Sequence, residues 1–341
     1  MISAMKSLTA RAAEGTPLTH DEMAEACESL LDEGQEVSAR AEFLSALHLR
    51  GETAEEIAGF VEILLSKATP FPASGEGAID VCGTGGDRAG MFNVSTAVMF
   101  VVAACGVRVI KHGNRGITSK SGGADVLEAL GVRVDLSPDR AAEALGSAGC
   151  CFLFAPNYHP AFRAVAPVRQ LLASQGKTSI FNMLGPLLNP ARPSLQLAGV
   201  FDPALLPVYG RAFQLLGRRS AWAVHGSPGF DEVSPLGPTS VTAWQDGTLR
   251  GFVIEPGTLG IRDVRAEDLA GGTAADNAGV ISSLVAGNLR HGARTIVQLN
   301  AAAALVVAGR SADLHAAWGL ASEALDSGAA RDALDRLRAA R

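Results

Sequence analysis

Hydrophobic positions beyond residue 77 alternate between short apolar runs and longer stretches of helical period. The short runs are rich in Val, Ile, Leu, Cys and Phe and are bounded by glycine or charged residues, which is typical of buried strands. A strand followed by a helix, repeated along the chain, favours an α/β fold with a mostly parallel central sheet flanked by helices. The predicted strands are residues 79–82, 107–110, 132–134, 151–155, 197–201 and 221–224.

The first 68 residues or so show only helical patterning. Thr19 with Glu22, and Thr53 with Glu56, form the capping-box pattern, in which a hydroxyl residue precedes a glutamate by three positions. An amphipathic stretch follows each box. Prolines and glycines between residues 70 and 77 then mark a linker. The pattern predicts a small all-helical N-terminal domain before the sheet domain.

Two later segments depart from the alternation of strands and helices. Residues 157–189 form a long interruption that contains several prolines, which suggests that the chain leaves the sheet and returns to it. Residues 240–244 and 249–254 flank an Asp-Gly pair at 246–247, a strong signal for a tight β-hairpin. From Ala301 onward the chain reads as helical and Ala-rich.

The composition is that of a globular protein with a sizeable core. The chain has 341 residues, of which 48% are hydrophobic and 19% charged, enough for two domains. Five cysteines, mostly in apolar runs, show no metal-ligand spacing and fit reduced core thiols. Neither a leader peptide nor a membrane-spanning run is recognised. We therefore expect a cytoplasmic protein without a membrane partner.

Two glycine-rich loops each lie between a predicted strand and a predicted helix. Residues 83–87 read GTGGD, and residues 111–116 read KHGNRG, followed by a second turn at 118–123, TSKSGG. Loops placed in this way offer backbone N–H groups to phosphates, so two phosphate-bearing ends of one ligand could bind here. Alternatively, the glycines only make tight turns.

The charge near these loops differs in sign from that of the whole chain. The formal net charge is −6, yet no acidic residue lies between Asp87 and Asp125. This local basic run indicates a small anionic ligand rather than nucleic acid, which usually requires a broadly basic surface. The cations of the run are Arg88, Arg108, Lys111, Arg115 and Lys120.

Asp231 and Glu232 follow the predicted strand at 221–224 on a glycine-containing loop. Ligands collect at strand ends in α/β sheets, and adjacent carboxylates supply the hard oxygen atoms that Mg²⁺ prefers. An exposed acidic turn is the alternative. Together with the phosphate-type loops, the pair favours a magnesium site.

Four segments together resemble the signatures of the anthranilate phosphoribosyltransferases, the family that acts in tryptophan biosynthesis. The similarity extends from about Leu18 to the C-terminus, and the superfamily also holds pyrimidine nucleoside phosphorylases. The segments are residues 83–87 (GTGGD), 93–96 (NVST), 111–115 (KHGNR) and 121–128 (SGGADVLE).

The resemblance implies a two-domain homodimer that joins anthranilate to phosphoribosyl pyrophosphate, giving phosphoribosylanthranilate and pyrophosphate. Residues 1–70, with about 160–190 returning to them, would form a helical dimerisation domain. Residues 71–159 and 191–341 would form the α/β domain that binds phosphoribosyl pyrophosphate. An aromatic amine is already nucleophilic at neutral pH, so catalysis would rest mainly on positioning and electrostatics.

The resemblance also implies roles for individual residues. The donor-binding residues would be Gly83, Gly86, Asp87, Asn93, Ser95, Thr96, Lys111, His112, Gly113, Asn114, Arg115 and Ser119. The acceptor-binding residues would be Gly83, His112, Asn114, His159 and Arg169. Ser95, Asp231 and Glu232 would bind Mg²⁺, and Lys111, Asp231 and Glu232 would be catalytic.

His159 and its neighbour Arg163 have plainer structural alternatives, and three features depart from the family pattern. His159 also fits a histidine at a helix start that bonds to backbone, and the nearby Arg163 fits a solvated surface residue. Met91 stands where the family usually has Thr or Ser, and Gly123 stands where Ser is usual. An insertion of about three residues follows Arg169 and bears most on the acceptor.

Two other functions stay open at this point. The first is nucleoside phosphorolysis on the same fold, which the Asp231–Glu232 pair disfavours because a diphosphate-bound magnesium has no obvious use there. The second is a non-catalytic paralogue that binds nucleic acid, which an acidic chain with three Trp and two Tyr disfavours.

Overall fold

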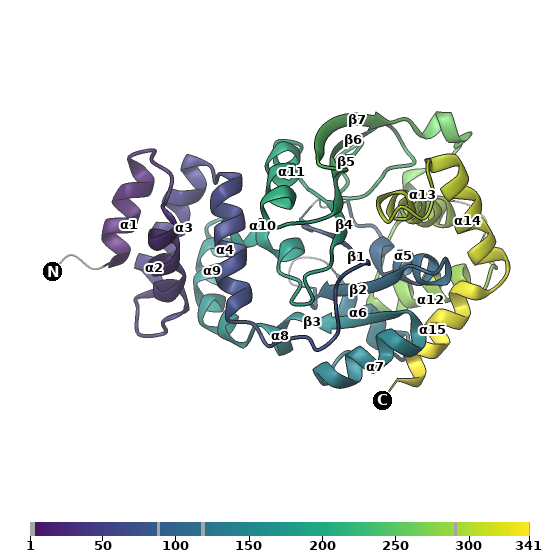
Figure 1. The fold of residues 1–341 in the computed structure, drawn as a ribbon, viewed down its shortest axis with the longest axis horizontal. Helices are drawn as coiled ribbons and strands as arrows, with labels where there is room; N and C mark the ends of the chain where they lie inside the picture. The colour runs from purple at the N-terminus through teal and green to yellow at the C-terminus, as the bar shows by residue number, and fades with distance from the viewer. Residues whose placement is uncertain (1–3, 87–88, 117–119, 290–291, 341) are drawn as a thin grey trace. The chain divides into compact units, whose positions relative to one another are not determined.

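The computed structural model describes residues 4–86, 89–116, 120–289 and 292–340. The chain divides into two compact units (Figure 1). The first comprises Met1–Thr69 and Pro156–Pro190, and the second comprises Pro70–Ala155 and Ala191–Arg341.

The first unit is entirely helical where it is described. In it α1 packs on α3, α2 on α4, and α9 on α3. Both predicted capping boxes are confirmed, with Thr19 at the start of α2 and Thr53 at the start of α4. Its elements are α1 (Ala4–Ala13), α2 (His20–Leu31), α3 (Val37–Arg50), α4 (Ala54–Ser66), α8 (Ala155–Tyr158, with Ala155 in the second unit), η1 (Pro160–Val165), α9 (Ala166–Ser174), α10 (Phe181–Leu184) and η2 (Gly185–Leu187).

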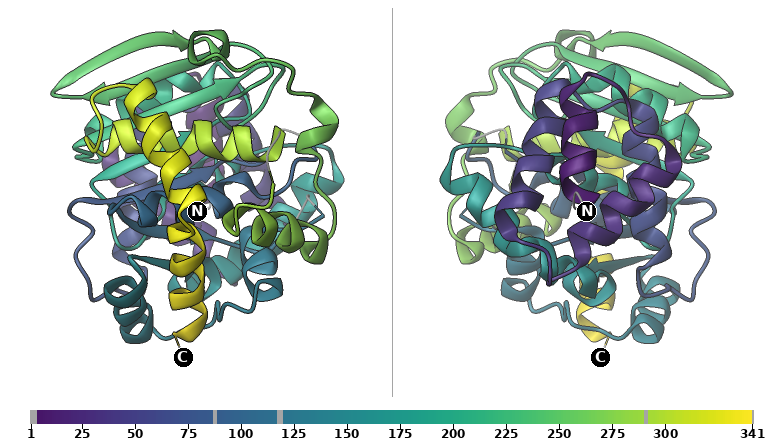
Figure 2. Two further views of the ribbon diagram at one scale, coloured as in Figure 1. Left: turned by 90° about the vertical axis from the view of Figure 1, so that its right-hand side faces the viewer. Right: turned by 90° about the vertical axis from the view of Figure 1, so that its left-hand side faces the viewer.

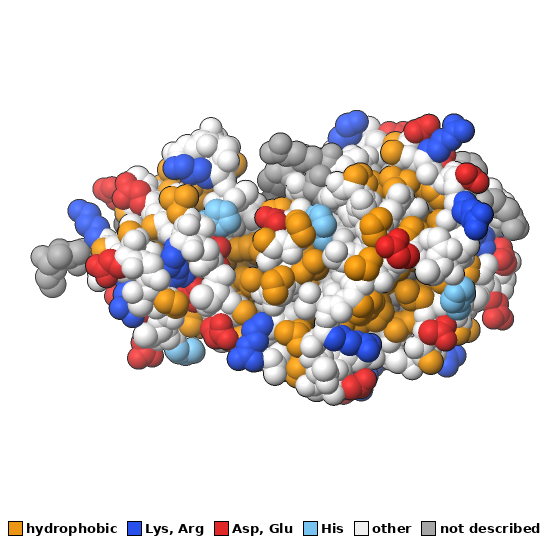
Figure 3. Space-filling model, turned by 90° about the horizontal axis from the view of Figure 1, so that it is seen from above, with side chains coloured by type: hydrophobic (Ala, Val, Ile, Leu, Met, Phe, Trp, Pro, Cys, Tyr) orange, Lys and Arg blue, Asp and Glu red, His pale blue; other side chains and the backbone are white. Residues whose placement is uncertain are grey.

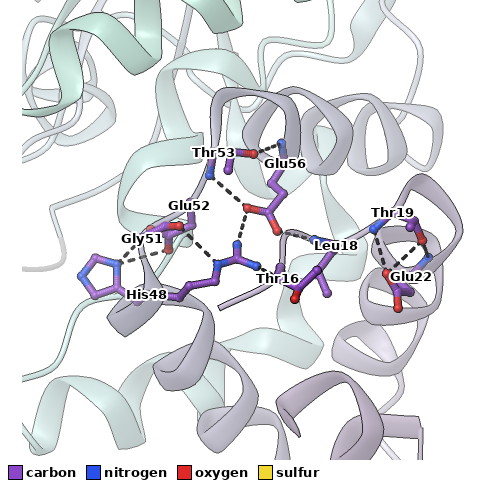
Figure 4. A network of polar contacts seen from close by, with 10 residues as sticks. Thr16, Leu18, Thr19, Glu22, His48, Gly51, Glu52, Thr53 and Glu56 are labelled. Carbon is purple, nitrogen blue, oxygen red and sulfur yellow. Dashed lines mark hydrogen bonds and ion pairs between the residues drawn. The ribbon is translucent and has the colours of Figure 1, made fainter. Parts of the chain in front are cut away.

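A buried carboxylate organises the polar contacts of the helical unit (Figure 4). Glu56, only 1% exposed, accepts hydrogen bonds from Leu18 N at 2.8 Å and Thr53 N at 3.0 Å. Arg50 pairs with Glu56 and also donates to Thr16 O at 2.6 Å. Because these bonds satisfy the buried charges, they fix the turn before α2 against the start of α4.

The second unit contains a seven-stranded sheet in the order β3-β2-β1-β4-β5-β6-β7. Neighbouring strands are parallel from β3 to β5, and β6 and β7 are antiparallel additions. The predicted fold class, a helical N-terminal bundle and a mostly parallel sheet flanked by helices, is therefore confirmed. The strands are β1 (Ala78–Gly83), β2 (Arg108–Gly113), β3 (Cys150–Phe154), β4 (Leu195–Gly199), β5 (Ser220–Gly226), β6 (Thr239–Gln245) and β7 (Thr248–Ile254).

The helix α5 lies at the centre of the helical cover of this sheet. It contacts β1 and β2 of the sheet, and it also contacts the C-terminal helices α13, α14 and α15 (Figure 2). This position explains why its sequence is apolar almost all round. The remaining elements are α5 (Val94–Ala104), α6 (Gly123–Ala129), α7 (Pro138–Ala148), α11 (Leu205–Leu215), η3 (Pro256–Leu259), η4 (Ala266–Leu269), α12 (Ala274–Val285), α13 (Gly292–Val307), α14 (Leu314–Asp326) and α15 (Ala329–Ala339).

The strand predicted at residues 132–134 is wrong. Helix α6 ends with Gly131 in the left-handed conformation, and Val132 N donates to Leu127 O while Gly131 N donates to Glu128 O. This pair of bonds is a Schellman motif, which buries the residue after the glycine against the helix. Val132 and Val134 are each 3% exposed. The alternating burial of this capped loop therefore gives the same hydrophobic pattern as a strand.

The other predicted elements are confirmed within a few residues, including the hairpin. Asp246 and Gly247 have φ of 53° and 72°, as a tight two-residue turn between β6 and β7 requires. On the edge strand β7, Leu249 and Val253 are exposed. The face of the molecule shown in Figure 3 has hydrophobic side chains interspersed with charges of both signs.

The five cysteines are free thiols, and three of them are buried. Burial raises the pKa of the Cys150 thiol to about 12, which makes it chemically inert at neutral pH. Among the described helices, none is long and apolar enough to cross a bilayer.

Candidate active site

The carboxyl ends of β1 and β4 lie at the point where the strand order reverses. From β1 the chain proceeds outward to β2 and β3, whereas β4 joins the opposite side of β1. In open α/β sheets ligands bind in the crevice outside such a switch point. Gly83 and Gly199, the last residues of the two strands, are paired in register there.

Asp231 packs directly against these two glycines. A β-carbon on Gly199 would lie 1.6 Å from Asp231 O, and one on Gly83 would lie 2.3 Å from Asp231 Oδ2. Gly226, which ends β5, lies similarly close to Glu232: a β-carbon on Gly226 would lie 2.3 Å from Glu232 O. Three strands therefore end in glycine because the Asp231–Glu232 segment occupies the space of their side chains.

The first glycine-rich loop holds the Asp231 carboxylate in place. Gly85 N donates to Asp231 Oδ2 at 2.7 Å. Gly85 and Gly86 both have positive φ, 67° and 84°, so the loop conformation itself requires glycine. Asp87, the last residue of this predicted motif, lies outside the described residues.

Lys111 on β2 is buried, at 4% exposure, beside the start of α5. Its Nζ donates to Val81 O at 2.5 Å and to Ser95 Oγ at 3.0 Å. Ser95 in turn lines a small cavity together with Glu232. The structure thus brings together a cation, a hydroxyl and a carboxylate that are remote from one another in the sequence.

These side chains fit a magnesium ion. Asp231, Glu232 and Ser95 supply only oxygen atoms, and one Asp231 oxygen is oriented by the Gly85 N–H. In the part of the chain that the structure describes, no group of three or more His, Cys, Asp and Glu side chains is arranged to hold a metal ion by itself. Mg²⁺ commonly takes one or two carboxylates from the protein and completes its shell with water and phosphate oxygens, so this donor set suits it.

The start of α5 carries Asn93 and Thr96. Asn93 Oδ1 accepts from Ser121 Oγ at 3.1 Å, and Asn93 Nδ2 donates to Ser121 O at 3.3 Å. The first turn of α5 is therefore tied to the second glycine turn. Thr96 is 1% exposed. The N-terminus of a helix favours an anion.

The second glycine-rich loop begins at the end of β2 with His112 and Gly113. His112 is 9% exposed, and a β-carbon on Gly113 would lie 2.9 Å from the Phe152 ring. In the loop that follows, Asn114 Oδ1 accepts from Arg115 N at 2.8 Å. Ser119 lies outside the described residues.

Arg115 is engaged by two carboxylates. It bonds to Glu128 through both terminal nitrogens and to Asp125 Oδ1 at 3.1 Å, and hydrogen bonds to Glu128 and Asp125 raise the pKa of its guanidinium. Asp125 also accepts from the N–H groups of Gly116 and Gly122. Arg115 therefore connects the loop to α6. Asp125 and Glu128, which lie just beyond the basic run in the sequence, partly neutralise its charge.

Of the predicted acceptor residues, Arg169 and His159 belong to the helical unit, whereas Gly83, His112 and Asn114 belong to the second unit. Arg169 on α9 is half-buried and has no carboxylate partner among the described residues; burial lowers the pKa of its guanidinium. His159 is 4% exposed and its Nε2 lies 2.8 Å from Leu188 O. Burial lowers the pKa of His159, so its neutral ring donates to this carbonyl, as in the backbone-bonded alternative. Arg163 is exposed, which agrees with a solvated role.

The three departures have clear structural positions. Met91 forms an isolated bridge with Ala270, and a β-carbon on Gly123 would lie 3.5 Å from Thr96 Oγ1, in ordinary contact. The insertion extends the end of α9, where Gly176 has φ of 67° and Lys177 N donates to Leu172 O.

Two buried amides of this site were missed from the sequence. Asn300 on α13 pairs with both backbone groups of Val233, accepting from its N and donating to its O at 2.8 Å each. Asn277 on α12 donates to Asn93 Oδ1 at 2.9 Å. The available signal for Asn300 was an asparagine set directly before the apolar run at 301–307.

Comparison with known proteins gives matches along nearly the whole chain. Residues 75–331 match the "Glycosyl transferase family, a/b domain", and residues 6–68 match the "Glycosyl transferase family, helical bundle domain". The chain is 45% identical to an anthranilate phosphoribosyltransferase of Methylorubrum extorquens (strain PA1), with 98% of each chain covered. It is 46% identical to that of Methylobacterium nodulans, again over 98% of each.

Solved structures give the same picture. The crystal structure of anthranilate phosphoribosyltransferase from Thermus thermophilus has a TM-score of 0.89 at 37% identity, covering 97% of this chain and 98% of that one. The Saccharomyces cerevisiae enzyme in complex with PRPP and Mg has a TM-score of 0.88 at 25% identity, covering 100% and 98%.

Proposed function

This chain belongs to the anthranilate phosphoribosyltransferases of the glycosyl transferase family, and from this membership we propose how its residues carry out the reaction. The enzyme transfers the phosphoribosyl group to anthranilate in tryptophan biosynthesis. The observation that supports the residue assignment most strongly is the convergence of Lys111, Ser95 and Glu232 at the switch point of the sheet.

The donor, phosphoribosyl pyrophosphate, would bind across the two glycine-rich loops and the start of α5. Displacing pyrophosphate from the ribose C1 develops negative charge on the leaving group and positive, oxocarbenium-like charge on the sugar. Lys111 is held by Val81 O and Ser95 Oγ, so its ammonium is already positioned to stabilise a phosphate oxygen. The remaining donor contacts would come from Gly83, Gly86, Asp87, Asn93, Thr96, His112, Gly113, Asn114, Arg115 and Ser119.

Asp231, Glu232 and Ser95 would hold Mg²⁺. The yeast relative was solved with PRPP and Mg, which supports the same cofactor here. The ion, when bound, supplies positive charge for the diphosphate. The glycine ends of β1, β4 and β5 leave room for the Asp231–Glu232 segment, and Gly85 N holds one oxygen of the Asp231 carboxylate.

Arg169 would bind the anthranilate carboxylate. A planar guanidinium meets a carboxylate through two parallel hydrogen bonds, and Arg169 is half-buried without a carboxylate partner among the described residues. The yeast relative was also solved with 4-fluoroanthranilate. His159, His112, Asn114 and Gly83 are the further acceptor contacts that we propose.

The same proposal extends to assembly and location. By resemblance to the family, the helical unit would form a homodimer, and the enzyme would be cytoplasmic, with small molecules rather than nucleic acid or membrane as its partners. Light scattering of the purified chain would show about twice the 35.1 kDa chain mass.

Pyrophosphate release tests the proposed function. With phosphoribosyl pyrophosphate and Mg²⁺ present, adding anthranilate should start the release of pyrophosphate, and adding uridine or thymidine should not. Cleavage of uridine or thymidine by inorganic phosphate, without activity on anthranilate, would favour the nucleoside phosphorylase alternative.

A further inference from the structure

Asn277 and Asn93 form a directed chain of hydrogen bonds beneath the donor loops. Asn277 is 2% exposed, and its Oδ1 accepts from Gly272 N at 2.8 Å. A backbone N–H can only donate, so this bond fixes which side of the Asn277 amide is oxygen. The Asn277 Nδ2 group must then face Asn93 and Ser121.

Asn277 and the Ser121 carbonyl together fix the orientation of the Asn93 amide. Asn93 Oδ1 accepts from Asn277 Nδ2 at 2.9 Å and from Ser121 Oγ at 3.1 Å, which uses both lone pairs. Asn93 Nδ2 donates one of its two N–H groups to Ser121 O. The other N–H has no acceptor among the described residues, so Asn93 presents a donor, and not its carbonyl, to a ligand at the start of α5.

The segment that carries Asn277 is itself docked on the donor loop. Gly271 N donates to Gly90 O at 2.7 Å, and Phe92 N donates to Leu269 O at 3.2 Å. A β-carbon on Gly271 would lie 2.4 Å from Met91 O, so the two backbones are in direct contact. The start of α12 therefore sits at a fixed place behind Asn93.

We propose that Asn277 is a positioning residue for the phosphoribosyl donor, because it acts with the Ser121 carbonyl to hold Asn93 with an N–H toward the donor's phosphates. The inference rests on the proposed donor-binding role of Asn93. An Asn93 amide turned by half a rotation would instead aim its carbonyl oxygen at the phosphates, and two electronegative groups would repel.

Two substitutions at one position separate positioning from packing. Asn277→Asp keeps the shape and can accept from Gly272 N, but it cannot donate to Asn93 Oδ1, so it sets two acceptor oxygens face to face and should turn or displace Asn93. Asn277→Ala removes the constraint without imposing the wrong orientation. Aspartate should therefore harm donor binding more than alanine does, whereas a purely structural role predicts that the cavity-forming alanine is worse.

The experiment is calorimetric titration of phosphoribosyl pyrophosphate, in Mg²⁺, into the intact folded enzyme. Asn277→Asp should raise the donor Kd by about tenfold to a hundredfold, the effect of losing a hydrogen bond to a charged group. Asn277→Ala should raise it less. Gln298→Ala is the matched control, since Gln298 is a buried amide on α13 that donates to Trp318 O; its Kd should equal that of the parent.

An Asn93→Ala background shows whether the effect passes through Asn93. There the difference between aspartate and alanine at position 277 should vanish; a persisting difference would mean direct repulsion by the new charge and overturn the proposal. Parent-like binding by both single variants would also overturn it. If the aspartate variant does not fold, Asn277→Ala carries the test, and a Kd equal to the parent's refutes the inference. A parent that binds no donor refutes the proposed function itself.

Discussion

The ammonium of Lys111 donates a hydrogen bond to the hydroxyl of Ser95 across 3.0 Å. Lys111 lies on β2, where the second glycine-rich loop begins, and Ser95 belongs to the first turn of α5, so the bond joins that loop to the helix that follows the first loop. Ser95 is also a proposed magnesium ligand, so its hydroxyl would contact both the Lys111 ammonium and Mg²⁺. Donor binding should therefore depend on Lys111.

Lys111→Ala should weaken donor binding by about one to two orders of magnitude, because it removes a charge-assisted contact of roughly 1.5–3 kcal/mol. Anthranilate affinity should change little. Lys67→Ala, which removes an exposed lysine of the helical unit, is the control. Calorimetry that gives the same donor Kd for Lys111→Ala and the parent would contradict this role.

The double variant Asp231→Asn with Glu232→Gln should lose most activity at ordinary Mg²⁺ while staying folded, because neutral amides are poor ligands for a hard dication. Raising Mg²⁺ should restore part of the rate. Asp139→Asn, at an exposed carboxylate on α7, should behave as the parent. Full activity of the double variant in chelator-treated buffer would remove the metal role from both carboxylates.

Gly199→Ala should abolish activity and destabilise the fold by about 1–3 kcal/mol, the usual cost of an overpacked site. The new methyl group would overlap the Asp231 carbonyl at 1.6 Å, so the Asp231–Glu232 segment must move. Gly146→Ala on α7 meets no atom within 4 Å and should be neutral or stabilising. The two variants are compared by thermal unfolding and by reaction rate. Equal behaviour would show that glycine is not required at position 199.

Arg169→Ala should raise the KM for anthranilate strongly, because it leaves the substrate carboxylate desolvated and unpaired. Arg163→Ala, at an exposed neighbour, should do less. Aniline lacks the carboxylate, so the parent should strongly prefer anthranilate to aniline and the Arg169 variant should lose much of that preference. An unchanged preference would exclude Arg169 as the carboxylate partner.

His48 makes the stability of the helical unit depend on pH. Its Nδ1 lies 3.2 Å from Glu52 Oε1 (Figure 4), and its Nε2 lies 2.8 Å from Thr178 Oγ1. The hydrogen bond to Glu52 raises the pKa of His48, so its contribution is complete below the unfolded pKa of about 6.5 and is lost as pH rises through the folded value. His48→Gln should lower the melting temperature more at a pH of about 5.5 than at about 8.5. An equal loss at both pH values would contradict an ionic contribution.

The parts of the fold that could be predicted are those with local causes. Thr19 and Thr53 cap their helices through residues three positions away, and the turn at Asp246 and Gly247 needs only its own backbone angles. Residues 132–134 failed because alternating burial arises equally from a strand and from a capped loop packed on a helix.

The parts of the site that could not be predicted depend on partners remote in sequence. Asn277 and Asn300 act on Asn93 and Val233, and neither pairing leaves a periodic signal. Nothing in the sequence explained glycine at 199 and 226, because Asp231 and Glu232 meet these positions only in the folded sheet. The ion pairs of Arg115 with Asp125 and Glu128 were also missed, because both carboxylates lie beyond the basic run.

The most direct test is the fluorescence of anthranilate mixed with the purified enzyme, phosphoribosyl pyrophosphate and Mg²⁺. The fluorescence should fall as anthranilate is converted to phosphoribosylanthranilate, one pyrophosphate should appear for each anthranilate lost, and omitting the donor or chelating the metal should stop both. Fluorescence that stays constant with folded enzyme and both substrates present would contradict the assignment.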